Sequence, residues 1–300
     1  MSKIVILRLH SGIGNQFFQF NFLNYLRKHY EIKKVYYDLS HYYPKLLWKK
    51  NNSFYLDNKY GIKFHLNRLT NINPTNFITI ALLKKISKYN NKYLNIKFLP
   101  IRVDDLNYND TSLFVKYKYI YLTGVFLDRE LIVNETIDFL REKGYLLIKD
   151  KIKNMNLNNS VSIHIRGKQY IELDINKTYL QPISINYYKN AVKYISDIIK
   201  NPNFYIFSND IDYARNICSK LNLKNFTIIE NNFDDLESLF LMSMCSNNII
   251  VNSSYSYWAA ILNKNKNKIV ISPKYFFNKN HFHYEIAQNL PLKNWVLINN

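Results

Sequence analysis

Short runs of β-prone apolar residues alternate along this chain with segments whose apolar residues recur at helical spacing. Near the N-terminus, a continuous apolar run at 3–10 precedes a polar loop at 11–16, a helical pattern at 17–30 and another β-prone run at 33–40. A continuous apolar run is typical of a strand that is buried on both faces of a parallel sheet. The pattern therefore predicts that the chain begins with a β-loop-α-β unit.

The alternation weakens from residue 41 to about 115 and then returns, with a strand expected at 118–126 and a helix at 134–145. The polar segment 149–160 has no apolar period, and we interpret it as a linker. Beyond the linker, strand and helix patterns alternate repeatedly, which is typical of a doubly wound α/β domain. The expected strands are 161–166, 203–210, 226–230, 247–253 and 268–274, and the expected helices are 184–200, 211–221, 234–245 and 256–263.

Each half of the chain thus begins with its own strand-helix-strand pattern. We predict an α/β protein of two Rossmann-like domains that face a cleft, with one domain at 1–155 and the other at 156–300. Ligands of open parallel sheets bind beyond the carboxyl ends of the strands, so the residues that follow each predicted strand are the candidates for a site.

The loop at 11–16 concentrates glycine directly after a predicted strand. Gly12 and Gly14 are two of only six glycines in the chain, and Asn15 and Gln16 complete the loop. Glycine lets main-chain N–H groups approach a ligand closely, and the start of a helix attracts anions. Since the pattern GxGNQ departs from the GxGxxG dinucleotide fingerprint, the loop predicts a polar ligand site of another kind. A simple tight turn between strand and helix is the alternative.

The strand at 161–166 ends in a second candidate group. His164 and Arg166 are two positions apart, so both point to one face of an alternating strand. The planar fork of arginine suits a diphosphate, and its charge persists in a partly buried site. A surface salt bridge of a strand-end arginine is the alternative.

Two further strand ends carry polar residues. Asn252, Ser253, Ser254 and Ser256 stand where a strand ends and a helix begins, so their side chains and the free N–H groups of that helix predict another anion site. Asp210 is suited either to accept a hydrogen bond from a ribose or base edge or to cap the helix that follows. No group of residues has the spacing of metal ligands, and we expect no metal.

Basic residues outnumber acidic ones by 41 to 22, which gives a formal charge of +19. Such an excess favours nucleic acid, nucleotide phosphates or an acidic membrane surface as partners. A basic nucleic-acid-binding protein is the alternative from another functional class, but it requires basic charge that is clustered with aromatic residues. The lysines here are dispersed along the chain, so nucleic acid is not an expected partner.

The two cysteines, Cys218 and Cys245, make no disulfide framework and no CxxC motif, which favours a reducing compartment. The first apolar run is too short for a secretory leader, and no stretch approaches 18 apolar residues. We therefore expect a cytoplasmic protein. The basic charge adds the expectation of peripheral contact with the anionic inner face of the plasma membrane.

Taken in order, the strand-end motifs resemble those of the bacterial α-1,2-fucosyltransferase family, glycosyltransferase family 11. Residues 11–23 read SGIGNQFFQFNFL where that family has GGLGNQMFQYAFA. HIRGKQY at 164–170 stands for HxRRGDY, and FSND at 207–210 stands for FSDD. IIVNSSYSYWAAILN at 249–263 stands for IIANSTFSWWAAWLN, and the resemblance covers nearly the whole chain.

The resemblance implies a GT-B-like fold, with an acceptor-side domain at 1–155 and a GDP-sugar-binding domain at 156–300. It implies metal-independent, inverting transfer of L-fucose from GDP-L-fucose to a sugar hydroxyl, the galactose 2-OH in α-1,2 linkage, in the synthesis of lipopolysaccharide O-antigen or another surface polysaccharide. The expected partners are this donor and a glycan acceptor, including a lipid-linked one, and no cofactor is expected. A transferase of the same fold that uses another nucleotide sugar is the alternative.

The resemblance also assigns roles to single residues. Arg166 matches the arginine that grips the donor diphosphate, and His164 matches the motif histidine, so both are expected catalytic residues. The expected donor-binding residues are Gly12, Gly14, Asn15, Gln16, Asp210, Asn252, Ser254 and Ser256.

This chain departs from the family motifs at several positions, among them GVFL at 124–127 where the family tends to have GYWQ. Gly167 replaces the second arginine, Gln169 replaces the acidic residue, and Asn209 replaces the first aspartate of FSDD. Arg166 is therefore expected to bear more of the diphosphate charge. With the family aspartate absent, Glu172 is the nearest candidate for a base in the sequence.

Overall fold

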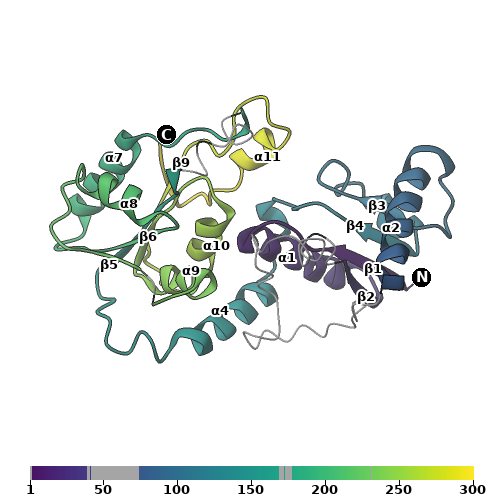
Figure 1. Cartoon of the computed structure of the whole chain (residues 1–300), viewed down its shortest axis with the longest axis horizontal. Coiled ribbons are helices and arrows are strands. Elements are labelled where there is room, and N and C mark those ends of the chain that lie inside the picture. The colour runs from purple at the N-terminus through teal and green to yellow at the C-terminus, as the bar shows by residue number, and fades with distance from the viewer. Residues whose placement is uncertain (1, 39–40, 42–73, 169–171, 173–177, 231) are drawn as a thin grey trace. The chain divides into compact units, whose positions relative to one another are not determined.

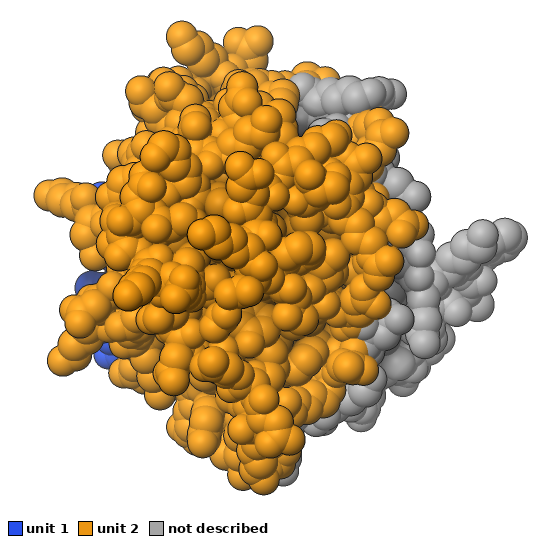
Figure 2. Space-filling model, turned by 90° about the vertical axis from the view of Figure 1, so that its left-hand side faces the viewer, with its two compact units in different colours: residues 1–136 blue, residues 137–300 orange. Residues whose placement is uncertain are grey.

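The computed structural model describes residues 2–38, 41, 74–168, 172, 178–230 and 232–300. The chain divides into two compact units, residues 1–136 and 137–300, which Figure 2 colours separately. The sequence predicted a boundary after residue 155, whereas the structure divides after residue 136. The two differ because most of helix α4 (Asn134–Ile148) and the polar segment after it belong to the second unit.

The first unit is built on a parallel sheet with the strand order β2-β1-β4-β3 (Figure 1). Two strands and one helix lie close to their predicted positions, since the periodic patterns there are strong. The helices at α2 and α3 and the short strand β3 were not predicted, because the sequence from 41 to about 115 lacks a clear period. Its elements are β1 Lys3–Arg8, α1 Ile13–His29, β2 Ile32–Asp38, α2 Pro74–Tyr89, the π-helical turn η3 Asn90–Leu94, β3 Ile101–Val103, α3 Thr111–Lys116, β4 Tyr119–Leu122 and the 3₁₀ turn η4 Arg129–Leu131.

The strand expected at 118–126 ends at Leu122, and a side chain from a neighbouring loop explains why. The Asp105 carboxylate accepts hydrogen bonds from the N–H groups of Val125 at 2.9 Å and Phe126 at 2.6 Å. Phe126 also has a positive φ of 60°, which a strand does not tolerate. Its buried ring stacks on Phe22 of α1 at a centroid distance of 4.1 Å, so aromatic packing holds the turn in place.

The second unit carries a six-stranded parallel sheet with the order β10-β9-β8-β5-β6-β7. Since β5 comes first along the chain in this unit, the order is that of a Rossmann fold. The predicted doubly wound α/β architecture is therefore confirmed, although several strands are shorter than expected. The elements after α4 are β5 Ser160–Ile165, α7 Ile185–Ile198, β6 Asn203–Ser208, α8 Ile211–Cys218, β7 Phe226–Ile228, α9 Asp235–Met244, β8 Asn247–Ile249, α10 Ser254–Leu262, β9 Val270–Pro273, α11 Tyr284–Gln288 and β10 Val296–Ile298.

One arginine and one glycine of helix α4 make close contacts with other helices of the second unit. The Arg141 guanidinium donates to the carbonyl oxygens of Leu262 at 2.9 Å and Asn263 at 3.2 Å, at the carboxyl end of α10. A cation at this position also complements the negative end of the helix dipole. Gly144 lies so close to Phe240 of α9 that an added Cβ would meet the ring at 2.2 Å.

Both cysteines are buried free thiols, and burial raises their pKa values to about 11 for Cys218 and about 12 for Cys245. A thiol with a raised pKa is a poor nucleophile, so these residues act as packing groups. Among the helices that the structure describes, none is long and apolar enough to span a bilayer.

Candidate active site

The strand order of the second unit marks one place on its sheet edge for a ligand. β5 and β8 are neighbours, and the chain continues from them toward opposite edges of the sheet. A crevice forms beyond the carboxyl ends of strands at such a switch point. Two of the motifs singled out in the sequence end at this point, one after β5 and the other after β8.

A hydrogen bond joins these two motifs. Arg166, just after β5, donates from Nη1 to the Oγ of Ser253 at 2.5 Å. Ser253 is the N-cap of α10, where its Oγ also accepts from the Tyr255 N–H at 3.4 Å. The guanidinium is therefore held beside the positive end of a helix dipole. An arginine and a helix start together make a site suited to a phosphate oxyanion.

Ser253 was named in the sequence among the polar residues of this strand end, but no donor-binding role was assigned to it. The sequence does hold a signal for it, since a serine that precedes a helical pattern is a typical N-cap. The contact with Arg166 depends on the pairing of β5 with β8, and strand order is not readable from local spacing.

His164 lies on β5 and is only 6% exposed. Burial, reinforced by the nearby Arg166 charge, lowers the pKa of His164 to about 3, so its imidazole is neutral near pH 7. In the described part of the chain its Nδ1 atom has no hydrogen-bond partner, and its ring lies 5.4 Å from that of Tyr255. A neutral imidazole donates and accepts hydrogen bonds, but it adds no positive charge to the site.

Asp210 occupies the position of a helix cap. One carboxylate oxygen accepts from the Tyr213 N–H of α8 at 3.0 Å, and the other accepts from the Lys168 N–H at 3.1 Å. Asn209 accepts from the Gly167 N–H at 2.9 Å. Both side chains thus hold the main chain that follows Arg166. A direct contact of Asp210 with the donor stays a prediction.

The three other residues predicted after β8 differ in their surroundings. Asn252 donates from Nδ2 to the carbonyls of Gln181 at 2.6 Å and Phe276 at 3.0 Å, so it ties two loops together. Ser254 is half-buried in the first turn of α10. Ser256 is fully buried, and its Oγ accepts from the Val251 N–H at 3.3 Å, which gives it a place inside the fold.

The four predicted residues of the first unit lie at the start of α1. Gly12 is the N-cap and supplies no side-chain cap, and no acidic residue stands in the first turn, which includes Gly14 and Asn15. A Cβ added to Gly12 would meet nothing within 4 Å, so packing within the protein does not explain this glycine. Gln16 is fully buried, and its Nε2 donates to the Ser11 carbonyl at 3.1 Å.

A second polar site in the first unit was missed in the sequence. A cavity of about 270 Å³ is lined by five basic residues, together with Tyr121 and Thr123 of the β4 end. The basic residues are Arg8, Lys84, Lys85, Lys88 and Arg102. They come from three separate parts of the sequence, β1, α2 and β3, so only the fold brings them together. We refer to this cavity as the basic pocket.

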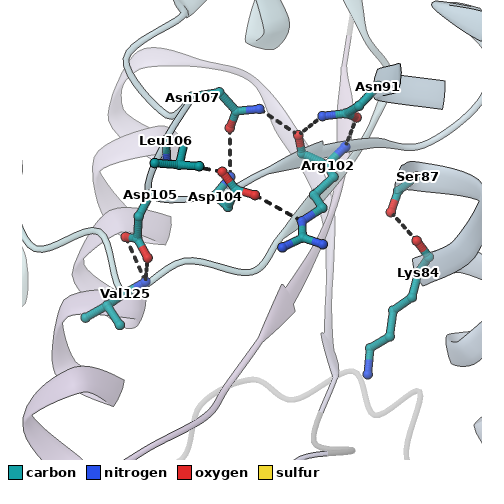
Figure 3. A network of polar contacts seen from close by, with 9 residues as sticks. All are labelled: Lys84, Ser87, Asn91, Arg102, Asp104, Asp105, Leu106, Asn107 and Val125. Carbon is teal, nitrogen blue, oxygen red and sulfur yellow. Dashed lines mark hydrogen bonds and ion pairs between the residues drawn. The ribbon is translucent and has the colours of Figure 1, made fainter. Parts of the chain in front are cut away.

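A network of hydrogen bonds fixes one wall of the basic pocket (Figure 3). Asn91 bonds both main-chain groups of Arg102 at 2.7 Å, and Asn107 adds a bond to the same carbonyl at 3.2 Å. The Arg102 Nε then donates to Asp104 at 3.1 Å. Arg102 is therefore held both at its main chain and at its guanidinium.

Among the described residues, the arrangement of side chains identifies neither a metal site nor a catalytic base. Within the described ranges, no group of three or more His, Cys, Asp or Glu side chains is placed to hold a metal ion. Glu172 is exposed and lies 3.6 Å from the Lys168 ammonium. Gln169, at the position of the family aspartate, lies outside the described residues.

Comparison with known proteins places these features in a family context. Residues 72–299 match the family model described as Glycosyl transferase family 11. The O-antigen biosynthesis glycosyltransferase WbnK of Escherichia coli is 28% identical over 96% of this chain and 98% of its own length. An α-1,2-colitosyltransferase of Escherichia coli is 29% identical over 40% of this chain and 42% of its own length.

Among solved structures, a mutant of Arabidopsis thaliana FUT1 in complex with GDP superposes with a TM-score of 0.50 at 12% identity. The match covers 90% of this chain and 70% of that one. At this level of identity the similarity concerns the fold, which agrees with the two parallel α/β sheets observed here.

Proposed function

The chain belongs to glycosyltransferase family 11, and from this premise we propose that it transfers L-fucose from GDP-L-fucose to a sugar hydroxyl. The transfer inverts the anomeric carbon, needs no metal ion, and serves the synthesis of O-antigen or a related surface glycan. The similarity to a relative named for O-antigen biosynthesis supports this role. The observation that carries the proposal is the bond from Arg166 to Ser253 at the start of α10.

The chemistry asks for charge stabilisation on the leaving group. The acceptor oxygen forms a bond to C1 of the fucose while the bond from C1 to the β-phosphate oxygen breaks, and GDP leaves with the electron pair. The proton of the hydroxyl passes to a base. Arg166 and the main-chain N–H groups at the start of α10 stabilise the charge that develops on the β-phosphate, and they are already in place before reaction.

His164 acts in this scheme as a neutral group. Since its pKa lies at about 3, it does not compete with Arg166 as a second cation. Its imidazole supplies a hydrogen bond to the donor beside the arginine. The same residues would position the diphosphate of any GDP-sugar, so a transferase for another nucleotide sugar remains the second candidate.

The acceptor and the linkage are a further part of the proposal. We propose the 2-OH of galactose and an α-1,2 linkage, and the relative named as an α-1,2-colitosyltransferase supports the linkage. That name also makes colitose a donor sugar to test beside fucose.

We further propose peripheral contact with an anionic membrane, through residues 82–98. This segment carries five lysines and no acidic residue. Six of its apolar and aromatic residues are between 43% and 79% exposed, namely Leu82, Tyr89, Tyr93, Leu94, Ile96 and Phe98. Exposed aromatic and aliphatic side chains among lysines are typical of a surface that lies on anionic lipid.

A donor panel tests the proposed function. The protein is given GDP-L-fucose, GDP-colitose, GDP-mannose and UDP-sugars in the presence of chelator, and release of the nucleoside diphosphate is followed. Turnover of GDP-L-fucose is expected to exceed that of the UDP-sugars. Turnover confined to UDP-sugars, or a strict need for added divalent metal, contradicts the proposal.

The arginine is tested by GDP binding. Arg166→Ala removes a charge-assisted contact, so GDP affinity is expected to fall by roughly tenfold to a hundredfold. Arg215→Ala is the matched control, since Arg215 is an exposed arginine of the same unit that pairs with Glu230. Unchanged affinity in Arg166→Ala would remove the arginine from the donor site.

A further inference from the structure

The basic pocket lies where the first unit is expected to bind a ligand. In the order β2-β1-β4-β3, β1 and β4 are the two central neighbours; the chain runs from β1 to β2 at one edge and reaches β4 from β3 at the other edge. Arg8 is the last residue of β1, and Thr123 directly follows β4. Both line the pocket, so it opens beyond the carboxyl ends of these two neighbouring strands, where parallel α/β sheets bind ligands.

The residues that line the pocket come from strands and from a helix. Arg102 and Tyr121 are register partners on β3 and β4. Lys84 and Lys88 are four residues apart on α2, so they lie on one face of that helix. Rigid strands and a helix thus present the basic groups.

Two of the five basic residues are balanced by carboxylates. Lys84 lies 3.1 Å from the buried Asp38, which also accepts a short hydrogen bond from the Tyr121 hydroxyl. Arg102 pairs with Asp104 at 3.1 Å. These acids are therefore engaged and do not neutralise the rest of the pocket.

The other three basic residues are not paired with a carboxylate of the described chain. Within the residues that the structure describes, Arg8, Lys85 and Lys88 make no ion pair. The Nε atom of Arg8 is buried there without any hydrogen-bond partner. A buried guanidinium donor without an acceptor is costly, and an oxyanion in the pocket would satisfy it.

We propose that the basic pocket binds an oxyanion of the acceptor, a phosphate or a carboxylate carried by the glycan or by its lipid carrier. This inference rests on the proposed transferase function and names the chemical class of its second substrate. The volume of 270 Å³ lies below the roughly 300 Å³ at which pockets for whole small molecules begin, so it fits a charged group and not an entire glycan. Arginine and lysine are the side chains that bind such groups.

The test uses the full chain with GDP at saturation, so that the donor site is occupied. Binding of inorganic pyrophosphate and of glucuronate is measured by calorimetry. Arg8→Gln and, separately, Lys88→Gln are compared with Lys33→Gln, an exposed lysine of the same unit that does not line the pocket. Because Lys88 is exposed, its substitution leaves the fold intact even if Arg8→Gln does not fold.

At least one probe is expected to bind the wild type, and its affinity is expected to fall by about tenfold in the two pocket variants only. Preference for pyrophosphate assigns the group to a phosphate of the acceptor, and preference for glucuronate assigns it to a carboxylate of the glycan. Binding of neither probe, or equal affinity in all variants, overturns the inference. GDP affinity is measured in parallel. Its loss in Arg166→Ala alone bears only on the proposed donor site, and the result for the basic pocket does not depend on it.

Discussion

At the scale of single residues, the contacts of the Arg166 guanidinium indicate its function. The sequence predicted a diphosphate ligand for it or a surface salt bridge, and the structure adds the Ser253 contact at a helix start. Asp210 and Ser256 show the limit of such predictions. Residue type and spacing do not reveal that both oxygens of Asp210 hold main-chain N–H groups, or that Ser256 is turned into the interior.

The neutral state of His164 predicts a pH dependence of stability. Its pKa is depressed in the folded chain to about 3, whereas an unfolded histidine titrates near 6.5. When the pH falls below about 6.5, the unfolded chain takes up a proton that the folded chain excludes. The free energy of unfolding therefore falls by up to about 1.4 kcal/mol per pH unit.

His164→Gln is expected to remove this part of the slope. The free energy of unfolding is measured with denaturant between pH 7 and pH 5 for the wild type, for His164→Gln and for His29→Gln, which alters an exposed histidine. Equal slopes for the wild type and His164→Gln would show that His164 is protonated in the folded protein.

Elements were predictable where burial imposes a period. The continuous apolar runs of β1 and β5 are buried strands, and the strand-helix alternation of the second unit follows the sequence closely. Helix α2 and the three-residue strand β3 were not predicted, since lysines interrupt the apolar pattern and side chains such as Asn91 fix the main chain from outside. The basic pocket takes four of its five basic residues from these unpredicted elements, which is why the sequence did not indicate it.

The close packing of α4 on α9 predicts that Gly144 tolerates no side chain. Alanine favours a helix over glycine by about 1 kcal/mol, yet here its Cβ would overlap the Phe240 ring, and overpacking costs about 1–3 kcal/mol. Gly144→Ala is therefore expected to lower the free energy of unfolding.

Chemical denaturation of Gly144→Ala and of Glu142→Ala, at an exposed position of the same helix, measures this effect. Adding Phe240→Leu to Gly144→Ala is expected to recover part of the loss, because the smaller side chain makes room. A more stable Gly144→Ala protein would contradict the observed packing.

The whole molecule combines two parallel α/β sheets, and each carries a candidate anion site beyond the carboxyl ends of its strands. In the second unit that site holds Arg166 and the start of α10, and in the first unit it is the basic pocket. The net charge of +19 is thus partly concentrated where anionic groups are expected. The remaining lysines, among them Lys92 and Lys97, are available for long-range attraction to an anionic surface.

Membrane contact by residues 82–98 predicts salt-sensitive binding to lipid. The full chain is expected to sediment with vesicles of phosphatidylglycerol and phosphatidylcholine, and much less with phosphatidylcholine alone. Each lysine near such a surface contributes about 1 kcal/mol, so Lys92→Gln and Lys97→Gln are each expected to weaken binding roughly fivefold.

Lys264→Gln, an exposed lysine of the second unit, is the control for the vesicle experiment. Equal losses in all three variants would mean that net charge alone drives binding. Equal binding to both kinds of vesicle would exclude an electrostatic membrane contact.

The contact between Gly167 and Asp210 limits which residues position 167 can hold. A Cβ at residue 167 would approach the Asp210 Cβ to 2.7 Å, so an arginine there, as in the family motif, requires the neighbouring chain to shift. Asn209 and Asp210 bond the main chain beside Gly167, so the shift would involve the β6–α8 turn. Substitutions at residue 167 and in this turn are therefore expected to be epistatic: a side chain at 167 is tolerated only together with a change in the turn.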